Sequence, residues 1–349
     1  MQIIKIEEND ANQRLDKFLK KLFINATRAL IYKFNRKWKI KVKQVWDDWF
    51  KKRDNEFKLS IWDEVKLFLS DKDIKELSAK RPVSIETGLR NSFNKKDIVF
   101  EDWDLFIINK SSWVNVHPWD FKSKEVSIIQ QVQDYLWEKL NSLTFKPSLV
   151  HRIDRDTSGI LMIAKKKDIL SKLVDDFKNH KKIQVKWKNS TQSARMVKKT
   201  YLAICFWKLP QKSWTITKKL LRIENAQNRN KVEINEKEGQ RAISHYKLVE
   251  EFVVETKDWK QNISVVEVQI ETGRMHQIRV HLESIKCPII WDKAYWNKSL
   301  NHYFEKEFQV KRQMLHAYKI EFFHYWRKKN MELQAKMKDD MKKFLEKIK

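Results

Sequence analysis

The chain has 349 residues, of which 73 are Lys or Arg and 46 are Asp or Glu, so its formal net charge is +27. Such a surplus favours phosphate-rich partners, with an anionic membrane surface as the rival. No apolar run is long enough to span a bilayer, and the N-terminus lacks the apolar stretch of a signal peptide. The two cysteines, Cys205 and Cys287, match neither a disulfide framework nor a metal-ligand spacing. These features predict a cytoplasmic, RNA-facing protein.

The first part of the chain alternates short helical and strand-like patterns. Residues 13–22 place apolar side chains at helical spacing, and a second helix is expected to begin near Asn25 or Thr27, both good N-cap residues. Two short strands are expected around residues 40–42 and 65–69. Basic side chains gather on the second helix and the following strand: Arg28, Lys33, Arg36, Lys37 and Lys41. Runs of charged residues are most often only a solvent-exposed face of an element.

A resemblance gives these basic residues a role. The segments RLDKFL and TRALIYKFNRKWKIKV are similar to the small RNA-binding domain first seen in ribosomal protein S-four. The resemblance covers residues 12–70. It implies a small α/β domain that binds the RNA backbone through its second helix and the next strand, and thus through the five basic residues just named.

A larger domain follows a polar stretch. Residues 71–95 contain Pro82 and Gly88 and are predicted to form a linker. Because the strand patterns that follow dominate and helices are interspersed irregularly, we predict an α+β domain over residues 96–326 rather than a doubly wound sheet. Residues 327–349 are predicted to be a basic, helical C-terminal tail. Strands are expected at residues 98–100, 105–108, 160–164, 201–206, 265–270 and 319–323, and a helix at 170–177.

The segment HRIDRDTSGILMIAK, residues 151–165, carries the strongest chemical signal. It places two carboxylates and two guanidiniums in a polar loop between two apolar strands. A surface loop of paired charges would have little energetic consequence. Loops held between buried strands, however, are a common place for functional residues, because the scaffold on either side is rigid.

At this loop the chain resembles a known family. HRIDRDTSG is similar to the motif of the pseudouridine synthases of the RluA, RluC and RluD group, which usually have Leu in place of Ile153. Three further segments follow in the family's order: KTYLAI at 199–204, ETGRMHQIRVHL at 271–282 and PIIWDKAYW at 288–296. With IVFEDWDLFIINKSSWVNVHP, the resemblance covers residues 97–323. It implies a long mixed, mostly antiparallel sheet and a monomeric enzyme that isomerises uridines, expected in 23S-type large-subunit ribosomal RNA.

The resemblance also implies roles for four residues. Asp154 is the catalytic carboxylate that attacks or deprotonates the ribose, and Arg279 pairs with it. Tyr201 stacks on the target base and is a candidate to take the proton from the carbon that becomes the new attachment point. Arg152 enters the space left by the flipped nucleotide. A charged carboxylate beside a guanidinium, a flat aromatic platform and base flipping suit this chemistry, which requires no cofactor and no metal.

Other features of the sequence allow other interpretations. The histidines form no helical metal-binding pair and are expected to be structural; those considered are His151, His276, His281 and His316. Asp156 is expected to stabilise its loop, and Cys205 to be buried. A non-catalytic RNA-binding or ribosome-assembly protein with the same fold is the main alternative; a metal-dependent nuclease would need a carboxylate cluster. The polar stretch 184–198 is longer than the family's usual segment and is either a target-specific loop or mere surface.

The tryptophan content is unusual. There are 15 Trp and only 4 Gly, although glycine is ordinarily among the commonest residues. An aromatic surface for stacking RNA is one explanation, but several tryptophans occupy turn contexts where the family has glycine, which accepts positive φ. We therefore hypothesise that the gene uses UGA for glycine and expect positive φ at Trp38, Trp62, Trp113, Trp119, Trp291 and Trp296.

Overall fold

The computed structural model contains two compact units. The described residues are 1–78, 93–118, 125–136, 139–140, 142–178, 183–187, 190–194, 197–223, 231–255 and 260–349. The first unit comprises Met1–Phe93, Ile129–Ser148 and Lys165–Asp168, and the second comprises Asn94–Ile128, Leu149–Ala164 and Ile169–Lys349. They are called the N-terminal unit and the C-terminal unit below.

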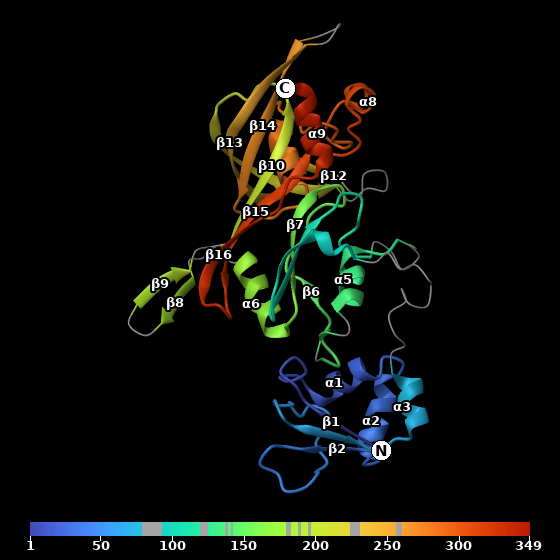
Figure 1. Cartoon of the computed structure of the whole chain (residues 1–349). Coiled ribbons are helices and arrows are strands. Elements are labelled where there is room, and N and C mark those ends of the chain that lie inside the picture. The colour runs from blue at the N-terminus through green and yellow to red at the C-terminus, as the bar shows by residue number, and fades with distance from the viewer. Residues whose placement is uncertain are drawn as a thin grey trace. The chain divides into compact units, whose positions relative to one another are not determined.

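The N-terminal unit begins with a small antiparallel sheet and three helices (Figure 1). Its elements are β1 (Gln2–Lys5), α1 (Leu15–Leu22), α2 (Arg28–Arg36), β2 (Ile40–Lys43), β3 (Glu64–Leu67) and α3 (Asp71–Leu77), with the strand order β1-β3-β2. The two predicted helices and two predicted strands are confirmed. Thr27 is the N-cap of α2, because its side chain accepts a hydrogen bond from the backbone N–H of Leu30.

One prediction for this part of the chain was wrong. Residues 71–77 form helix α3 and are not part of a linker. The helix starts with a capping box, in which Ser70 and Asp73 each accept a hydrogen bond from the other's backbone N–H. The polarity of the segment concealed this signal. The rest of the predicted linker lies outside the described residues up to position 92.

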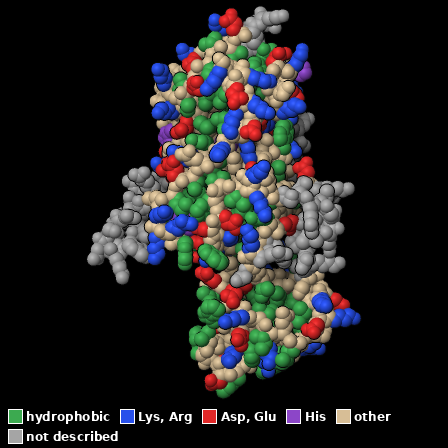
Figure 2. Space-filling view, viewed as in Figure 1, with side chains coloured by type: hydrophobic (Ala, Val, Ile, Leu, Met, Phe, Trp, Pro, Cys, Tyr) green, Lys and Arg blue, Asp and Glu red, His purple; other side chains and the backbone are tan. Residues whose placement is uncertain are grey.

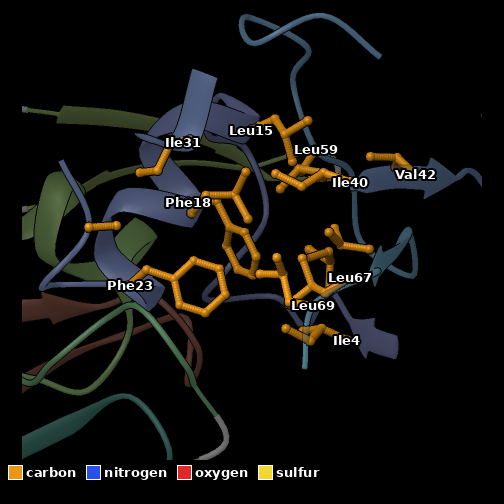
Figure 3. Packing of buried hydrophobic residues seen from close by; sticks show 14 of the residues in the cluster. Ile4, Leu15, Phe18, Phe23, Ile31, Ile40, Val42, Leu59, Leu67 and Leu69 are labelled. Carbon is orange, nitrogen blue, oxygen red and sulfur yellow. The ribbon is translucent and has the colours of Figure 1, made fainter. Parts of the chain in front are cut away.

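A compact apolar core holds the N-terminal unit together (Figure 3). Leu15 and Phe18 of α1, Ile31 of α2 and Leu67 of β3 all belong to this core, and all four side chains are fully buried. The helical spacing of the first two places them on one face of α1. The opposite faces of both helices therefore remain available to solvent.

The C-terminal unit is built on one large sheet. From residue 95 onward the elements are η1 (Lys95–Asp97), β4 (Ile98–Glu101), β5 (Leu105–Lys110), α5 (Ile128–Leu136), β6 (Ser148–Leu149), β7 (Ser158–Ala164), α6 (Lys167–Lys178), β8 (Ile183–Trp187), β9 (Ser190–Ala194), β10 (Lys198–Phe206), β11 (Ser213–Ile223), β12 (Lys231–Ile234), β13 (Gln240–Glu255), β14 (Lys260–Ile270), α7 (Gln277–Ser284), α8 (Lys298–Phe308), β15 (Leu315–His324), β16 (Lys329–Gln334) and α9 (Asp339–Ile348). Of these, α5 belongs almost wholly to the N-terminal unit. The predicted α+β class is confirmed.

The sheet has eleven strands in the order β12-β11-β13-β14-β10-β15-β7-β5-β4, with β16 beside β15 and β6 beside β7. Strands β13, β14 and β10 run side by side in Figure 1. Of the pairings with a described register, only β15 with β7 is parallel. This agrees with the predicted long mixed, mostly antiparallel sheet. All seven residues of β7 are buried, which explains why SGILMIA reads as an unbroken run of small and apolar residues.

The end of the chain differs from the predicted helical tail. Residues 329–334 form strand β16, which pairs with β15, and only residues 339–348 are helical. Met331 and Leu333 alternate with polar residues, which is a strand pattern that the abundance of lysine obscured. Phe344 of α9 is buried against Phe304 and Phe308. The segment is therefore packed against the C-terminal unit.

Two surface features complete the description. Strands β8 and β9, which overlap the long polar stretch 184–198, pair as a separate antiparallel ribbon. On the face shown in Figure 2, Lys and Arg side chains lie among acidic ones and form no single continuous patch. Among the described helices, none has the length and apolar character needed to cross a membrane.

Several tryptophans have a left-handed backbone conformation. The prediction of positive φ is confirmed at Trp38 (58°), Trp62 (72°), Trp113 (68°) and Trp291 (62°). The prediction was wrong at Trp296, which lies in a bend but does not have a positive φ. Trp119 lies outside the described residues. Trp207, which was not predicted, has φ of 84°.

Candidate active site

Asp154 lies in the loop between β6 and β7. The loop turns at this residue, because the N–H of Thr157 donates to the carbonyl oxygen of Asp154 at 3.2 Å. A buried lysine at the end of β5, Lys110, stabilises the loop. Its Nζ donates hydrogen bonds to the carbonyl oxygens of Arg155, Ser111 and Val114 at 2.8–3.0 Å. Burial lowers the pKa of Lys110 to about 7. These hydrogen bonds therefore fix the backbone of the loop that carries Asp154.

The C-terminal side of the loop is anchored to β15. Ser158 Oγ is 2.8 Å from Nδ1 of His316, and the Nε2 of His316 is 3.2 Å from the carbonyl oxygen of Ala335. Because a carbonyl can only accept, Nε2 carries the proton and Ser158 donates to Nδ1. Gly159 then passes so close to β15 that a Cβ there would lie 2.3 Å from the carbonyl oxygen of Ala317. This approach fixes where β7 begins.

Arg279 comes from helix α7, and a hydrogen-bonded turn sets the start of that helix. The side-chain oxygen of Gln277 accepts from Thr272 Oγ1 at 2.7 Å and from the N–H of Arg274 at 3.1 Å. His276, directly before the helix, has a left-handed backbone conformation with φ of 53°. Since the turn and the helix are joined in this way, the guanidinium of Arg279 projects from a fixed position.

The guanidinium of Arg279 binds two carboxylates at once. Its Nη1 donates to Oδ2 of Asp154 at 3.1 Å, while Nε and Nη2 donate to Oδ2 and Oδ1 of Asp292 at 2.6 and 2.8 Å. Burial opposes the charge of Arg279, but the hydrogen bonds and charges of Asp292 and then of Asp154 raise its pKa above the ordinary value. Arg279 is therefore cationic, as the predicted pairing with Asp154 requires.

Tyr201 lies on β10 at an irregularity in its pairing with β15, where the register shifts between Thr200 and Tyr201. Such a bulge changes the direction of a side chain relative to the rest of its strand. The ring is buried, with 8% of its surface exposed. Burial, and then the charge of Asp154, raises the pKa of Tyr201, so its hydroxyl keeps its proton at neutral pH.

The four predicted catalytic and base-flipping residues surround one pocket. Asp154, Tyr201, Arg279 and Arg152 all line it, although they come from a loop, a strand and a helix far apart in the sequence. Apolar side chains complete the walls; these are Ile153, Ile270, Ile278 and Leu315. The pocket thus combines an ion pair with apolar and aromatic surfaces suited to the faces of a planar ring.

A second aromatic residue, Tyr295, connects the parts of the site. Its ring centroid is 5.0 Å from the guanidinium carbon of Arg279. Its hydroxyl accepts from the N–H of Val232 at 2.8 Å and is 2.9 Å from Nδ1 of His276. Burial raises the pKa of Tyr295 to about 12. His276 Nε2 lies 3.8 Å from Asp154 Oδ2, and burial lowers the pKa of this histidine despite the nearby carboxylate.

The other histidines that we considered for a metal have structural contacts. The backbone N–H of Met162 donates to Nε2 of His151, and Nδ1 of His281 bonds the hydroxyl of Ser244. Burial lowers the pKa of His151 to about 3 and that of His281 to about 4. Within the described part of the chain, no group of three or more His, Cys, Asp or Glu residues is arranged to hold a metal ion.

Five of the six basic residues predicted to bind RNA lie in the N-terminal unit, and the sixth, Arg152, lines the pocket. Four are exposed on or next to helix α2, and Lys41 on β2 is half-buried. Arg28 contacts Asp16 at 3.6 Å. Lys41 lies 5.3 Å from the ring of Phe68. The exposed residues are Arg28, Lys33, Arg36 and Lys37.

Sequence reasoning missed the structural importance of three residues. Asp292 lies in the recognised segment PIIWDKAYW, but its partner is 13 positions away in the chain and only the fold brings them together. Tyr295 belongs to the same segment. Lys110 is the last residue of the buried strand β5, and a lysine in that position gives no signal that it is itself buried.

The chain is similar to known RNA pseudouridylate synthases. The family model described as RNA pseudouridylate synthase matches residues 104–284. The ribosomal large subunit pseudouridine synthase C of Buchnera aphidicola subsp. Baizongia pistaciae is 33% identical over 337 residues, which cover 95% of this chain and 92% of that protein. The protein of the same name from Vibrio cholerae is 29% identical and covers 100% of this chain and 97% of its own length.

Solved structures show the same fold. Human RNA pseudouridylate synthase domain containing 4 superposes with a TM-score of 0.54 at 20% identity, covering 72% of this chain and 93% of that one. Human RNA pseudouridylate synthase domain containing 1 gives a TM-score of 0.51, also at 20% identity, over 69% and 83% of the two chains. The resemblance that the motifs indicated is confirmed: this chain belongs to the RNA pseudouridylate synthase family.

Proposed function

We propose that this enzyme converts uridines of large-subunit ribosomal RNA to pseudouridine, with Asp154 as its catalytic carboxylate. The observation that carries the proposal is the Asp154–Arg279 pair at 3.1 Å, at a pocket with apolar and aromatic walls. The relatives from Buchnera and Vibrio are named ribosomal large subunit pseudouridine synthases, which supports the RNA class. We also propose that the enzyme acts as a monomer in the cytoplasm.

The reaction rearranges bonds without gaining or losing atoms. The bond from the ribose C1′ to N1 of uracil breaks, the base rotates, C1′ bonds to C5, and the proton on C5 leaves while N1 gains one. Asp154 assists the first step by attacking C1′ or by removing a ribose proton, and the cationic Arg279 keeps its carboxylate charged and oriented. The apolar walls retain the detached base while it turns.

Tyr201 is proposed to be the platform on which the uracil stacks. Burial and the charge of Asp154 raise its pKa, so the phenolate that could act as a base is scarcely populated at neutral pH. This favours the stacking role over the second role considered, removal of the C5 proton. Arg152, exposed at the pocket, is proposed to occupy the space that the flipped nucleotide leaves in the RNA.

The decisive experiment is Asp154→Asn, which keeps the shape of the side chain and removes its charge. Pseudouridine formation should fall below detection while RNA affinity stays within about threefold, because phosphate contacts dominate affinity. Asp156→Asn, in the same loop, is the matched control and should retain turnover. Substantial turnover by Asp154→Asn would refute the assignment, and RNA binding without any turnover by the parent protein would favour a binding protein without catalysis.

Tyr201→Phe separates the two roles of that residue. If stacking is its contribution, the variant should lose less than about tenfold in kcat, because the ring is retained. A residue that transfers a proton typically contributes about 10²–10⁴-fold. A loss in that range, with unchanged RNA affinity, would assign the proton transfer to the hydroxyl.

The exposed basic residues of helix α2 are proposed to bind the RNA backbone. Neutralising Lys33 and Lys37 together by Gln should make the plot of log affinity against log salt shallower by roughly one to two, since each phosphate contact contributes about 0.7–0.9 to the slope. The double change Lys72→Gln and Lys75→Gln on α3 is the control and should leave the slope unchanged. Equal slopes in both doubly substituted proteins would show that α2 is not an RNA-binding helix.

A further inference from the structure

Arg279 uses two of its side-chain nitrogens for Asp292 and the third for Asp154. Asp292 binds Nε and Nη2 side-on, at 2.6 and 2.8 Å, and is fully buried. Asp154 accepts a hydrogen bond only from Nη1 of this guanidinium, at 3.1 Å, and its side chain is 30% exposed. Among the described residues, none donates a hydrogen bond to Oδ1 of Asp154. The two carboxylates therefore have unequal contacts with the same guanidinium.

Asp292 is itself held by backbone groups. Its Oδ1 accepts from the N–H groups of Ala294 and Tyr295 at 3.0 and 3.2 Å, and its own N–H donates to the carbonyl of Ile289 at 3.2 Å. The ring of Tyr295 then lies over the guanidinium of Arg279. A carboxylate fixed in this way determines the plane of the guanidinium, because an Arg–carboxylate fork is planar and bidentate.

We propose that Asp292 is a positioning residue for the reaction, on the basis of the function proposed above for Asp154. By occupying two of the three nitrogens of Arg279, it leaves only one for Asp154. Without Asp292, Arg279 would have two buried donors unpaired, and the carboxylate that could satisfy them is that of Asp154. Asp154 would then be bound through both oxygens and drawn away from the pocket. Asp292 thus keeps Oδ1 of Asp154 available to the ribose.

The test is Asp292→Asn in the full-length protein, assayed on ribosomal RNA. We expect kcat to fall about 100-fold, the effect of a displacement of roughly 1 Å at a reacting group, with KM within threefold. Asp292→Glu should recover part of kcat. On an Arg279→Ala background the same substitution should cost less than threefold, because the guanidinium that it positions is gone.

Asp340→Asn is the matched control. Asp340 forms a similar side-on pair with Arg312, through Nε at 2.5 Å and Nη2 at 2.9 Å, but does not line the pocket. The substitution Asp340→Asn should lower the melting temperature of the protein while leaving kcat unchanged. Asp292→Asn overturns the proposal if it lowers only stability or only raises KM, or if its effect on kcat persists without Arg279. Failure of the proposed function is separate, since it would appear as turnover by Asp154→Asn.

A second, independent observation concerns the backbone at five tryptophans. Trp residues make up five of the ten described non-glycine residues with positive φ. Positive φ is rare for a bulky side chain, because Cβ approaches the following carbonyl oxygen. The five positions are Trp38, Trp62, Trp113, Trp207 and Trp291.

The hydrogen bonds at three of these positions define motifs that favour glycine. After helix α2, the N–H of Lys39 donates to Phe34 O and that of Trp38 to Asn35 O, which is the Schellman ending with Trp38 at the glycine position. Trp62 is the third residue of a turn closed by a bond from Asp63 N–H to Ser60 O at 3.2 Å.

Trp291 occupies the same position in the turn that carries Asp292. This turn is closed by the bond from Asp292 N–H to Ile289 O, and the indole Nε1 of Trp291 is buried without a hydrogen-bond partner among the described residues. The other four side chains are 40–59% exposed. The indoles contact neighbouring rings and cations, such as Lys5 Nζ at 4.4 Å from the Trp62 ring and Lys293 Nζ at 4.5 Å from the Trp291 ring. Such contacts do not require the left-handed backbone, which glycine adopts without strain.

We infer that the native protein has glycine at these five positions because the gene's UGA codons are read as glycine. Peptide mass spectrometry of the protein isolated from its source cells tests this directly, with the peptide that contains Gly159 as the internal control. Glycine masses at all five positions are expected. A tryptophan mass at any of them overturns the inference for that gene.

Discussion

Gly159, near the start of β7, and Trp38, after helix α2, both have a positive φ but differ in the space around them. Gly159 has φ of 112° and lies against β15, where a Cβ would be 2.3–2.7 Å from three backbone atoms of Ala317. Trp38 has φ of 58°, and 59% of its side chain is exposed. The comparison separates two reasons for glycine. Positive φ costs about 1–2 kcal/mol and can be tolerated, whereas a backbone clash cannot be relieved without moving a strand.

The largest expected effect comes from adding one methyl group at Gly159. Gly159→Ala forces β7 and β15 apart, and these strands are paired in parallel at Gly159 and Ala317. The cost should exceed the typical stability of a domain, about 5–15 kcal/mol, so the protein should be insoluble or lack a cooperative unfolding transition.

Gly273→Ala is the matched control for that substitution. A Cβ at Gly273 would lie 3.6 Å from the flexible end of Lys199, an ordinary contact. This variant should therefore fold with a melting temperature within a few degrees of the parent. Soluble, cooperatively folding Gly159→Ala protein would show that the close approach does not limit this position.

Gly159 also shows what the sequence could reveal. Its place in HRIDRDTSG, together with the order of the later motifs, was enough to predict the family, the mixed sheet and the meeting of Asp154, Tyr201 and Arg279. The close approach to Ala317 could not be predicted, because it joins residues 158 positions apart. Similarly, Asp292 could be placed in a motif but not opposite Arg279, and the capping of α3 was hidden in a polar stretch.

A smaller effect concerns the pH dependence of the strand pairing beside Gly159. The neutral imidazole of His316 accepts from Ser158 and donates to Ala335 O, and burial lowers its pKa to about 4 from an ordinary 6.5. As pH falls below about 6.5, the unfolded chain takes up a proton that the folded chain refuses until about pH 4. Stability should therefore fall across this window, by up to about 3 kcal/mol from His316.

His316→Gln tests this contribution, because an amide keeps polar contacts and does not titrate between pH 7 and 4. Urea unfolding at a series of pH values should show a flatter pH dependence than in the parent, whatever the change in stability at pH 7. His151 and His281 should leave a residual slope, since burial also lowers their pKa values. Parallel pH profiles for the two proteins would contradict the assigned role. Trp38 lies in a unit that contains no histidine, so its surroundings should not share this dependence.

The smallest expected effect is at Trp38, where the substitution should stabilise. Trp38→Gly relieves a left-handed backbone worth about 1–2 kcal/mol. It also removes contacts with Lys52 and Lys41, whose Nζ atoms lie 5.0 and 5.9 Å from the ring, near the outer limit of about 6 Å for a cation–π interaction. The net gain should be about 1 kcal/mol, which slows hydrogen exchange of the Lys39 amide roughly fivefold.

Trp46→Gly is the control. The Trp46 side chain is 73% exposed and its backbone φ is not positive, so the added backbone freedom should not slow that exchange. Faster exchange in Trp38→Gly than in the parent would mean that the indole contacts outweigh the backbone strain, and that this turn prefers tryptophan.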